Sequence, residues 1–358
     1  MCGIAGIVDY SGRGIDGPAI EKMLCAINYR GPDESGIYLS EHTGIGNVRL
    51  SIIDLSTGQQ PLSDISGRYW IVFNGEIFNY RELREMLLQK GYTLKTHSDT
   101  EVLVQLYSIY GKECLSMLNG QFAFAIWDKV KEEIFLARDR IGIRPLFYNL
   151  SGGRLTFGSE IKSIFTQKEI VPEFSYENLS QIYTFWTAIT PGTAFKNIFE
   201  LSPGHYLVYN REGIKTGRYW ELNYNDTFSG ITINKALEDF HELFYDAVRI
   251  RLRADVEVAA YLSGGIDSSS TVAYIKDIEP GVLNTFSIGF RDRDFDETEY
   301  QNEAVKFLNT RHKSITCSSD DISQSFPRVI WHTETPVTRT APAPMFLLSR
   351  LVREKDRK

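Results

Sequence analysis

The sequence predicts a two-domain protein of mixed α and β structure, with a parallel α/β sheet in the second domain. Three observations predict this fold class. The chain has 358 residues, which corresponds to about two domains. Its first two hundred residues alternate between short strand-like and helix-like segments. After residue 233, apolar strands alternate with helices, which is the pattern of a parallel sheet.

The first domain is predicted to span residues 1–206. Four short segments are apolar or rich in β-formers and predict strands: 4–8, 70–73, 122–127 and 134–137. Residues 80–90 carry Leu83, Met86 and Leu87 at helical spacing and end before Gly91. Ser98 and Glu101 have the spacing of a capping box, which predicts a second helix that runs to residue 110.

A polar segment, residues 207–232, reads as a connector, because it contains Gly213, Gly217 and an Asn225-Asp226 turn. The second domain is then predicted to span residues 233–358. Residues 233–253 predict an amphipathic helix, 256–262 a strand, and 283–290 a further strand. Between the two strands lies Ser263-Gly-Gly-Ile-Asp-Ser-Ser269, followed by another helix.

Composition limits the classes of function. The net charge is −7, so there is no basic excess to neutralise nucleic-acid phosphates. The sequence has no signal-peptide pattern and no apolar stretch of membrane-spanning length. Its four cysteines form no CxxC pair, which argues against a zinc site or a disulfide framework. We expect a reducing, cytoplasmic compartment and no nucleic-acid or membrane partner.

Cys2 is the first candidate for chemistry. Removal of Met1 would place a thiol and an α-amine on one Cα atom. The amine has an ordinary pKa of about 7.7–8.0 and the thiol of about 8.5, so the amine can act as general base near neutral pH, directly or through water. The alternative interpretation is a small buried cysteine at the end of a strand.

Other residues suit an acyl-transfer site around such a nucleophile. Asn74 and Gly75 follow a predicted strand, and a side-chain amide with a backbone N–H could stabilise an oxyanion; the alternative is an Asn-Gly turn. Arg49 could bind a substrate carboxylate, or could form a surface ion pair. Asp99 could hold an ammonium group, or could simply favour the start of its helix.

The stretch 263–269 is the second candidate. A strand, a glycine-rich turn and a helix start together present backbone N–H groups to phosphate oxygens. No Gly-Lys-Ser/Thr follows, so this is not the common nucleotide-binding loop. Asp267 could bind Mg²⁺, which prefers oxygen ligands. The alternative is a tight turn with serine caps.

Two further groups of residues are weaker candidates. The six histidines have no metal-ligand spacing, and we interpret them as surface or structural residues. An acidic run after a predicted strand reads as a solvated loop or as a neighbour of a nucleotide and Mg²⁺; it contains Asp292, Asp294, Asp296 and Glu297. Arg339 and Thr340 could face an active cleft.

Taken together, these motifs resemble a known family in content and order. Cys2-Gly-Ile-Ala-Gly6, Arg30-Gly-Pro-Asp33, Arg49-Leu-Ser-Ile-Ile-Asp54, Asn74-Gly-Glu-Ile77, Ser98-Asp99 and the segment 137–147 resemble the class II, N-terminal-cysteine glutamine amidotransferase domain. With Ser263-Gly-Gly-Ile-Asp-Ser268 and Phe286-Ser-Ile-Gly-Phe290, the whole chain resembles glutamine-hydrolysing asparagine synthetases.

For the first domain, the resemblance implies an N-terminal nucleophile hydrolase fold, with two antiparallel sheets between helices in an αββα order. Cys2 would attack the glutamine carboxamide to give a thioester and ammonia, and Asn74 and Gly75 would form the oxyanion hole. The implied glutamine-binding residues, which include Arg49 for the α-carboxylate and Glu76 and Asp99 for the α-amine, are Arg49, Leu50, Ser51, Ile52, Ile53, Asn74, Gly75, Glu76 and Asp99.

For the second domain, the resemblance implies part of an ATP-pyrophosphatase domain. ATP and Mg²⁺ would be required, and aspartate would be adenylated and then attacked by ammonia. A homodimer is compatible with the family. The implied ATP-binding residues, with Asp267 on Mg²⁺, are Leu262, Ser263, Gly264, Gly265, Asp267, Ser268 and Ile288.

Two departures from the family leave alternatives open. Tyr29 stands where the family has histidine. The chain ends in a charged, helix-like stretch at 351–358, before a second phosphate-contacting loop and the acceptor pocket are reached, so we expect a C-terminally truncated chain. The alternatives are a glutaminase with an inactive or incomplete synthetase half, an amidotransferase for another carboxylate, and a non-catalytic regulatory protein.

Overall fold

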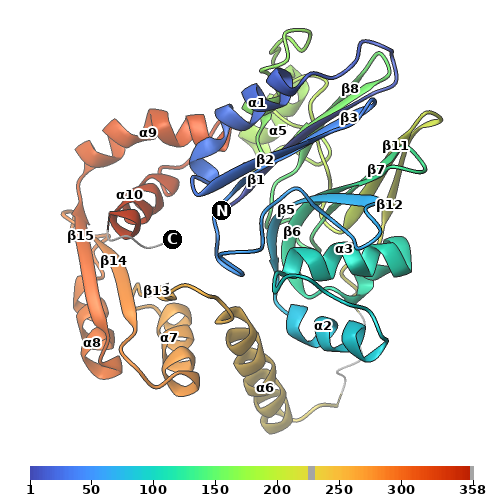
Figure 1. Cartoon of the computed structure of the whole chain (residues 1–358). Coiled ribbons are helices and arrows are strands. Elements are labelled where there is room, and N and C mark those ends of the chain that lie inside the picture. The colour runs from blue at the N-terminus through green and yellow to red at the C-terminus, as the bar shows by residue number, and fades with distance from the viewer. Residues whose placement is uncertain (225–229, 355–358) are drawn as a thin grey trace. The chain divides into compact units, whose positions relative to one another are not determined.

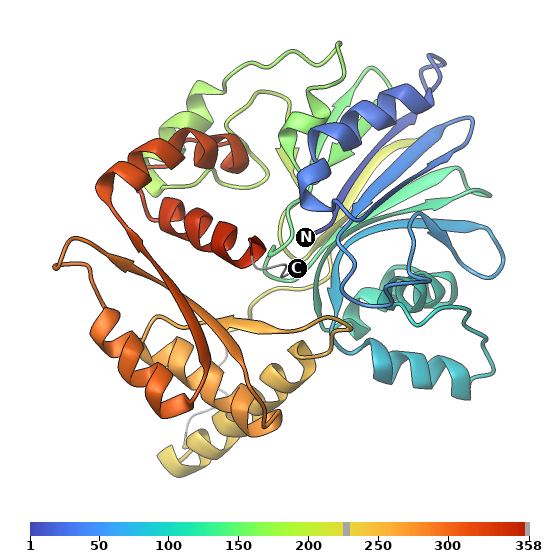
Figure 2. The ribbon, with the colours of Figure 1, turned by 60° about the vertical axis from the view of Figure 1, so that its left-hand side comes forward.

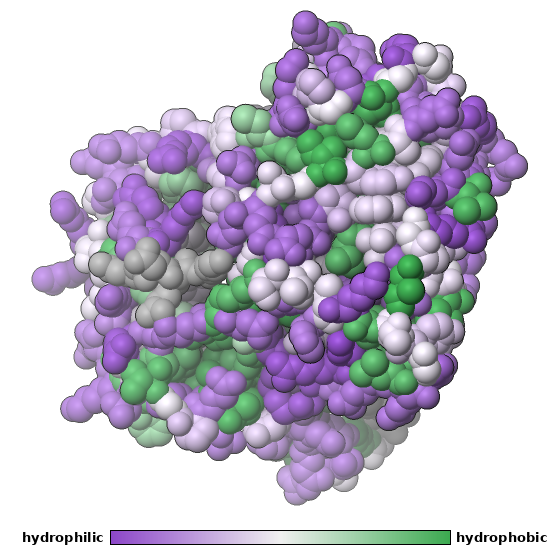
Figure 3. Space-filling view, viewed as in Figure 1, coloured by the Kyte–Doolittle hydropathy of each residue, from purple (hydrophilic) through white to green (hydrophobic). Residues whose placement is uncertain are grey.

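The computed structural model describes residues 1–224 and 230–354, and the chain divides into two compact units. Unit 1 comprises Met1–Asn223 and Glu334–Pro336, and unit 2 comprises Tyr224–Thr333 and Val337–Lys358. The turn expected at Asn225-Asp226 and the last four residues of the charged tail lie outside the described residues. Figure 1 labels most of the helices and strands of both units, and hydrophilic residues predominate on the face in Figure 3.

Among the described residues, unit 1 contains two six-stranded antiparallel sheets. The first has the order β10 (Phe199–Glu200), β8 (Phe147–Ser151), β9 (Arg154–Gly158), β1 (Gly3–Asp9), β3 (Thr43–Arg49) and β2 (Glu34–Leu39). The second has the order β12 (Gly213–Arg218), β11 (His205–Asn210), β7 (Glu133–Arg138), β6 (Gly120–Asp128), β5 (Tyr69–Ile77) and β4 (Leu62–Ser63). The two antiparallel sheets expected for the first domain are therefore confirmed.

Helices cover the outer faces of the two sheets. Helix α1 (Gly17–Ala26) packs on β1 and β3, and α3 (Asp99–Tyr110) packs on β5 with α2 (Tyr80–Gln89) beside it. Strands β1 and β3 also contact β5, so the sheets face each other and the layers follow the αββα order. The remaining helical elements of the unit are α4 (Ile161–Ile164), α5 (Tyr176–Phe185), η1 (Asn28–Arg30) and η2 (Gly111–Met117).

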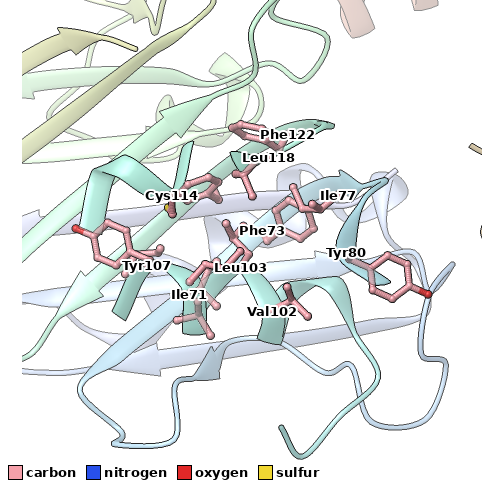
Figure 4. Packing of buried hydrophobic residues seen from close by; sticks show 14 of the residues in the cluster. Ile71, Phe73, Ile77, Tyr80, Val102, Leu103, Tyr107, Cys114, Leu118 and Phe122 are labelled. Carbon is pink, nitrogen blue, oxygen red and sulfur yellow. The ribbon is translucent and has the colours of Figure 1, made fainter. Parts of the chain in front are cut away.

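The central strand β5 is buried on both faces, because its side chains alternate between two hydrophobic clusters. Ile71 and Phe73 pack against α3 residues such as Leu103, as Figure 4 shows. Val72 points the other way, into a cluster that contains Ile4 of β1. Residues that follow on β5 are consequently held rigidly beside the first strand of the chain.

Strand β5 is longer than the predicted segment 70–73. It continues to Ile77, and Asn74 and Gly75 pair with Ala123 and Phe122 of β6. The interpretation of Asn74-Gly75 as a turn is therefore wrong. Asparagine and glycine are depleted in strands, which is why sequence alone ended the strand too early.

The two helices predicted in this domain are present. Helix α2 ends at Gln89, just before Gly91, whose φ is +85°. Ser98 caps α3 by accepting the N–H of Glu101 through its side chain. The carboxylate of Glu101 does not complete the capping box, since it accepts the N–H groups of Lys95 and Thr96 instead.

The segment expected to be a connector contains a hairpin of unit 1. Strands β11 and β12 pair in antiparallel fashion, and β11 also pairs with β7, so residues 205–218 extend the second sheet. The strand β12 lies at the sheet edge and none of its residues is buried, so the strand needs no continuous apolar face. This polarity explains why the sequence read as a linker.

Unit 2 contains a parallel sheet of order β13 (Ala259–Tyr261), β14 (Asn284–Phe290) and β15 (Arg311–Cys317) within the described residues. Its helices are α6 (Ile233–Arg251), α7 (Ile266–Ile278), α8 (Thr298–Leu308), α9 (Ser319–Thr333) and α10 (Pro342–Arg353). Figure 2 shows α10 on one face of the sheet and α7 and α8 on the other. The predicted parallel arrangement is confirmed, although β13 is shorter than the segment 256–262. Of the described helices, none has the length and apolar character needed to span a bilayer.

Candidate active site

Cys2 lies directly before β1, at the end of a strand that pairs with β3 and β9. Because Gly3 pairs with Val48, the chain that leaves β3 passes next to residue 2. The Cys2 Sγ atom lies 3.4 Å from the backbone nitrogen of Leu50 and 3.6 Å from its carbonyl oxygen. The thiol is thus held against the segment predicted to bind glutamine.

Burial shapes the protonation of this terminus. It raises the pKa of the Cys2 thiol above its ordinary value, while the N–H of Leu50 and the charge of Arg49 act in the opposite direction. Burial also lowers the pKa of the Met1 amine to about 6. Burial at this end of β1 thus disfavours the charged forms of both the Met1 amine and the Cys2 thiol.

Asn74 is the polar residue whose environment most clearly requires a ligand. Its side chain is buried, and neither its Nδ2 nor its Oδ1 atom has a hydrogen-bond partner among the described residues. A buried amide without partners is costly, so such a group is explained best by a ligand that it binds. Its neighbour Gly75 has a packing reason of its own, because a Cβ there would lie 2.2 Å from the carbonyl oxygen of Gln121.

Arg49 is buried and already makes several contacts. Its NH2 group donates to the carbonyl oxygens of Ile53 (2.9 Å) and Asp54 (2.7 Å), and its NH1 group bonds the carboxylate of Glu34 at 3.0 Å. Arg49 therefore shapes the loop after β3. A substrate carboxylate at Arg49 would share the guanidinium with Glu34. The sequence analysis did not identify Glu34 as a partner of Arg49.

The rest of the predicted glutamine segment is ordered by similar contacts. The N–H of Ser51 donates to the Asp33 carboxylate at 2.9 Å, and the Ser51 hydroxyl is buried without a partner in the described part of the chain. Ile52 packs against the core beside α3. Asp33 belongs to the Arg30-Gly-Pro-Asp33 motif, which the sequence analysis recognised. Its contact with the N–H of Ser51 could not be predicted from that motif.

Asp99 is a buried acid at the start of α3. Burial raises its pKa from about 3.8 to about 7, with a further contribution from the charge of Glu76, although its Oδ2 atom accepts the N–H of Ile77 at 3.0 Å. The charges of Arg49 and Asp99 both act on the Cys2 thiol. The structure thus brings Cys2, Arg49, Glu76 and Asp99 within electrostatic range of one another.

The second candidate site begins at the carboxyl end of β13. Gly264 has a φ of +83°, and a Cβ there would lie 2.7 Å from the backbone nitrogen of Gln301, so only glycine fits. The N–H of Ser263 donates to the Ser268 hydroxyl at 3.1 Å, which closes the loop. Gly265 is the N-cap of α7 and has no side chain that could accept a hydrogen bond. The N–H groups in the first turn of α7 therefore lack a side-chain cap, and a helix start of this kind favours a bound anion.

A cavity of about 590 Å³ lies within unit 2 and includes this loop. Its walls come from the segments that follow β13, β14 and β15, which is where open α/β sheets bind ligands. Ser263 and Ile288 of the predicted ATP set line it. The lining residues that sequence reasoning did not assign to ATP include Phe290, Arg291, Phe295, Gln301, Ser318 and Pro344.

Apart from Ser263 and Ile288, the predicted ATP residues do not line the cavity. Leu262 is buried in the core of unit 2, and its N–H donates to the carbonyl oxygen of Phe286. The carbonyl oxygen of Ile288 accepts from the Gln301 amide at 3.0 Å, so that carbonyl is already engaged. Asp267 is exposed in the first turn of α7.

The acidic residues after β14 differ in where their side chains lie. Asp292 and Glu297 line the cavity, whereas Asp296 accepts the N–H of Phe290 and the hydroxyl of Thr298 and so shapes the loop. Thr340 also lines the cavity. Within the described ranges, no three His, Cys, Asp or Glu side chains are grouped as a metal site.

Comparisons with known proteins match a family model to each of the two parts of the chain. Residues 1–220 match the family model described as glutamine amidotransferase domain, and residues 239–358 match the model described as asparagine synthase. A solved structure of the glutamine phosphoribosylpyrophosphate amidotransferase from B. subtilis covers 89% of this chain and 81% of its own at 19% identity. Its TM-score is 0.47, which is too low to support an argument.

The first of these family matches covers more than half of the chain, so the class of the protein is that of the glutamine amidotransferases. An asparagine synthetase [glutamine-hydrolyzing] 1 of Bacillus subtilis is 36% identical over 98% of this chain and 55% of its own length. A putative asparagine synthetase of Methanocaldococcus jannaschii is 34% identical over 99% of this chain and 72% of its own. The chain belongs to the glutamine-hydrolysing asparagine synthetase family, and it spans about half the length of the Bacillus relative.

Proposed function

We propose that unit 1 hydrolyses glutamine at Cys2 and that unit 2 binds ATP for amide synthesis on a carboxylate, with aspartate as the expected acceptor. The observation that carries the proposal is the buried Asn74 amide, which lacks a partner and lies on the strand that contacts β1, at whose start Cys2 lies. This combination supports an acyl-transfer site with a ready oxyanion hole.

The glutaminase reaction would use the α-amine of Cys2 as its base. After removal of Met1, the amine of Cys2 would accept the thiol proton, directly or through water, as the sulfur attacks the glutamine carbonyl carbon. Asn74 Nδ2 and the Gly75 N–H would hold the developing oxyanion. Collapse of that intermediate, with transfer of the proton from the amine to the leaving nitrogen, would release ammonia and leave a glutamyl thioester, which water would hydrolyse to glutamate and free thiol.

Substrate orientation would come from the charged residues around Cys2. Arg49 would bind the α-carboxylate of glutamine, and the acids Glu76 and Asp99 would bind its α-ammonium group. The backbone of residues 50–53 would complete the pocket, since Leu50 already contacts the sulfur.

Unit 2 would bind ATP with its pyrophosphate over the loop 263–268 and its base in the adjoining cavity. The exposed carboxylate of Asp267 suits Mg²⁺, since this ion usually combines one or two carboxylates with phosphate oxygens and water. Bound there, Mg²⁺ would neutralise phosphate charge. A homodimer remains a prediction.

A second candidate function is amide transfer to a carboxylate other than aspartate. Two relatives that are each 32% identical over 94% of this chain are named as amidases, from Gibberella zeae and Penicillium rubens. The described residues include no motif that selects the acceptor. The acceptor is therefore best identified by comparing product formation from aspartate with that from other carboxylates.

The test uses the chain as its host makes it, together with its Cys2→Ala variant. We expect the wild type to release glutamate from glutamine and the variant to release none. With ATP, aspartate and ammonium, we expect both proteins to form asparagine, because Cys2 serves glutamine alone. Equal glutamate release by the two proteins would refute the role of Cys2, and glutamate release without any ammonia-dependent product would favour a glutaminase alone.

A further inference from the structure

Behind Cys2 lies a cluster of five ionisable side chains to which the proposed reaction assigns no role. Tyr29 and Arg30 come from η1, Glu160 and Lys162 from the start of α4, and Glu334 from the three-residue segment that joins unit 1 between α9 and α10. The Arg30, Glu160 and Glu334 side chains are each less than one-tenth exposed.

The contacts form a continuous series that begins at the nucleophile. Arg30 donates through Nε to the carbonyl oxygen of Cys2 at 2.9 Å and through NH1 to Glu160 at 2.6 Å. Glu160 also accepts hydrogen bonds from Tyr29 and Lys162. Lys162 then bonds Glu334 at 3.0 Å. Each link is charge-assisted or involves a buried acid, and hydrogen bonds of this kind are stronger than those between neutral groups.

Glu334 is held unusually firmly for a residue in a connection. Its carboxylate accepts the N–H groups of Ile161 and Lys162, each at 2.6 Å, at the start of α4. Its φ is +55°, a conformation that non-glycine residues adopt rarely and keep only where surrounding contacts impose it. These contacts fix the segment 334–336 on unit 1, although the chain on either side of it belongs to unit 2.

Charged groups connect Glu334 to Arg30, because Lys162 pairs with Glu334 and Glu160, and Glu160 pairs with Arg30. Burial alone would raise the pKa of Glu160, but Arg30, Lys162 and Tyr29 together hold it below its ordinary value, so Glu160 is ionised. Lys162 lies between two carboxylates and divides its interaction between them. Without Glu334, Lys162 keeps Glu160 and the Tyr29 hydroxyl as partners but has one carboxylate fewer, so it draws more strongly on Glu160 and weakens the interaction of Glu160 with Arg30.

We propose that Glu160 is a positioning residue for Cys2, which orients Arg30 on the Cys2 carbonyl, and that Glu334 adjusts this contact by competing for Lys162. The inference rests on the proposed glutaminase function of Cys2. On this proposal, binding of the segment 334–336 to the start of α4 controls the rate of glutamine hydrolysis. The carbonyl of residue 2 fixes the backbone from which the thiol projects, so a small shift there changes the attack geometry.

The first test is Glu160→Gln, assayed as glutamate release per Cys2 thiol that an electrophilic glutamine analogue can titrate. We expect kcat to fall about tenfold or more with KM for glutamine within a factor of about two, since misplacement of a nucleophile affects the chemical step. Glu160→Asp should recover part of the loss. Glu173→Gln is the control, because Glu173 lies in unit 1 but its carboxylate is exposed and bonds the exposed Lys196 at 2.9 Å.

The second test asks whether the residues act in series. Glu334→Gln should lower kcat, and the double variant with Glu160→Gln should be no slower than Glu160→Gln alone. If Glu160→Gln fails to fold, Tyr29→Phe removes one hydrogen bond to Glu160 and should lower kcat by a smaller factor.

Three outcomes would overturn the inference: kcat within twofold of wild type for Glu160→Gln, or for Tyr29→Phe where that variant stands in for it; independent, multiplicative effects in the double variant; or a loss of titratable thiol that accounts for all lost activity. A wild-type chain without glutaminase activity would instead refute the proposed function and this inference with it.

Discussion

The buried acid Asp99 allows a quantitative prediction. Asp99→Asn keeps an oxygen that can accept the N–H of Ile77 but removes the charge that the buried site opposes. We expect the variant to be more stable than wild type at alkaline pH and to lose that advantage as the pH falls. Glutamine binding should weaken at the same time, because the proposed partner of the substrate ammonium is lost.

The magnitude follows from the raised pKa. Burial moves the Asp99 pKa from about 3.8 to about 7 in the folded state. At about 1.4 kcal/mol per pKa unit, ionisation of the folded protein costs about 4 kcal/mol above pH 7. The folded state binds the proton more tightly than the unfolded state, so stability falls as pH rises between the two values. About 1.5 kcal/mol of this cost is present at pH 5, so the advantage of the variant should grow by about 2.5 kcal/mol between pH 5 and pH 8.5.

The unfolding free energy can be measured by urea denaturation with tryptophan fluorescence as the signal, since four of the five tryptophans lie in unit 1. Comparing the same variant at two pH values cancels the constant cost of placing asparagine at this position. The control Glu85→Gln replaces an exposed acid on α2 and should show no pH-dependent gain. An Asp99→Asn variant whose gain in unfolding free energy is equal at pH 5 and pH 8.5 would refute the reasoning.

Three further predictions follow from individual contacts. Gly264→Ala places a Cβ 2.7 Å from a backbone nitrogen of α8 at a φ of +83°, so we expect titration calorimetry to detect no ATP binding, whereas Gly281→Ala, at an open position, should bind normally. Arg138→Met removes the donor to three backbone carbonyls, two of them buried, and the ion pair with Glu200, so it should lower the unfolding free energy of unit 1 by about 3 kcal/mol or more in urea. Glu34→Gln removes the carboxylate bound to Arg49, so KM for glutamine should fall several-fold in the glutamate-release assay.

Each of these can fail in a distinct way. Wild-type ATP affinity in Gly264→Ala would mean that the loop does not hold the phosphates. A loss of less than about 1 kcal/mol in Arg138→Met would mean that water replaces the guanidinium at low cost. An unchanged or higher KM in Glu34→Gln would show that Glu34 does not compete with the substrate carboxylate.

Sequence reasoning identified the parts of the site that are local in the chain. Cys2, Arg49, Asn74 and Asp99 each occur in a short motif, and the structure brings Cys2, Arg49 and Asp99 into electrostatic range. Glu160 had no such signal, because it bonds residues more than a hundred positions away in the chain, such as Arg30. Contacts of this kind have no spacing that a periodicity or a motif can reveal.

The fold was predictable where hydrophobic periodicity was strong. The segments around β1, β6 and β7 are buried and apolar, and their strands occur where expected. The edge strand β12 escaped prediction, because one face of an edge strand needs no apolar neighbours. The cavity of unit 2 was identified only in part, since its aromatic residues Phe290 and Phe295 flank a polar loop that gave no periodic signal.

The path of the chain through residues 334–336 also limits how the two units can be separated or recombined. A cut after residue 223 would remove Glu334 along with unit 2 and leave the N–H groups of Ile161 and Lys162 without their acceptor. The units are therefore not independent modules in series along a gene. A hybrid that joins this first unit to a foreign partner would need that partner to supply an acid at the same place, and this requirement can be used to screen natural or engineered fusions.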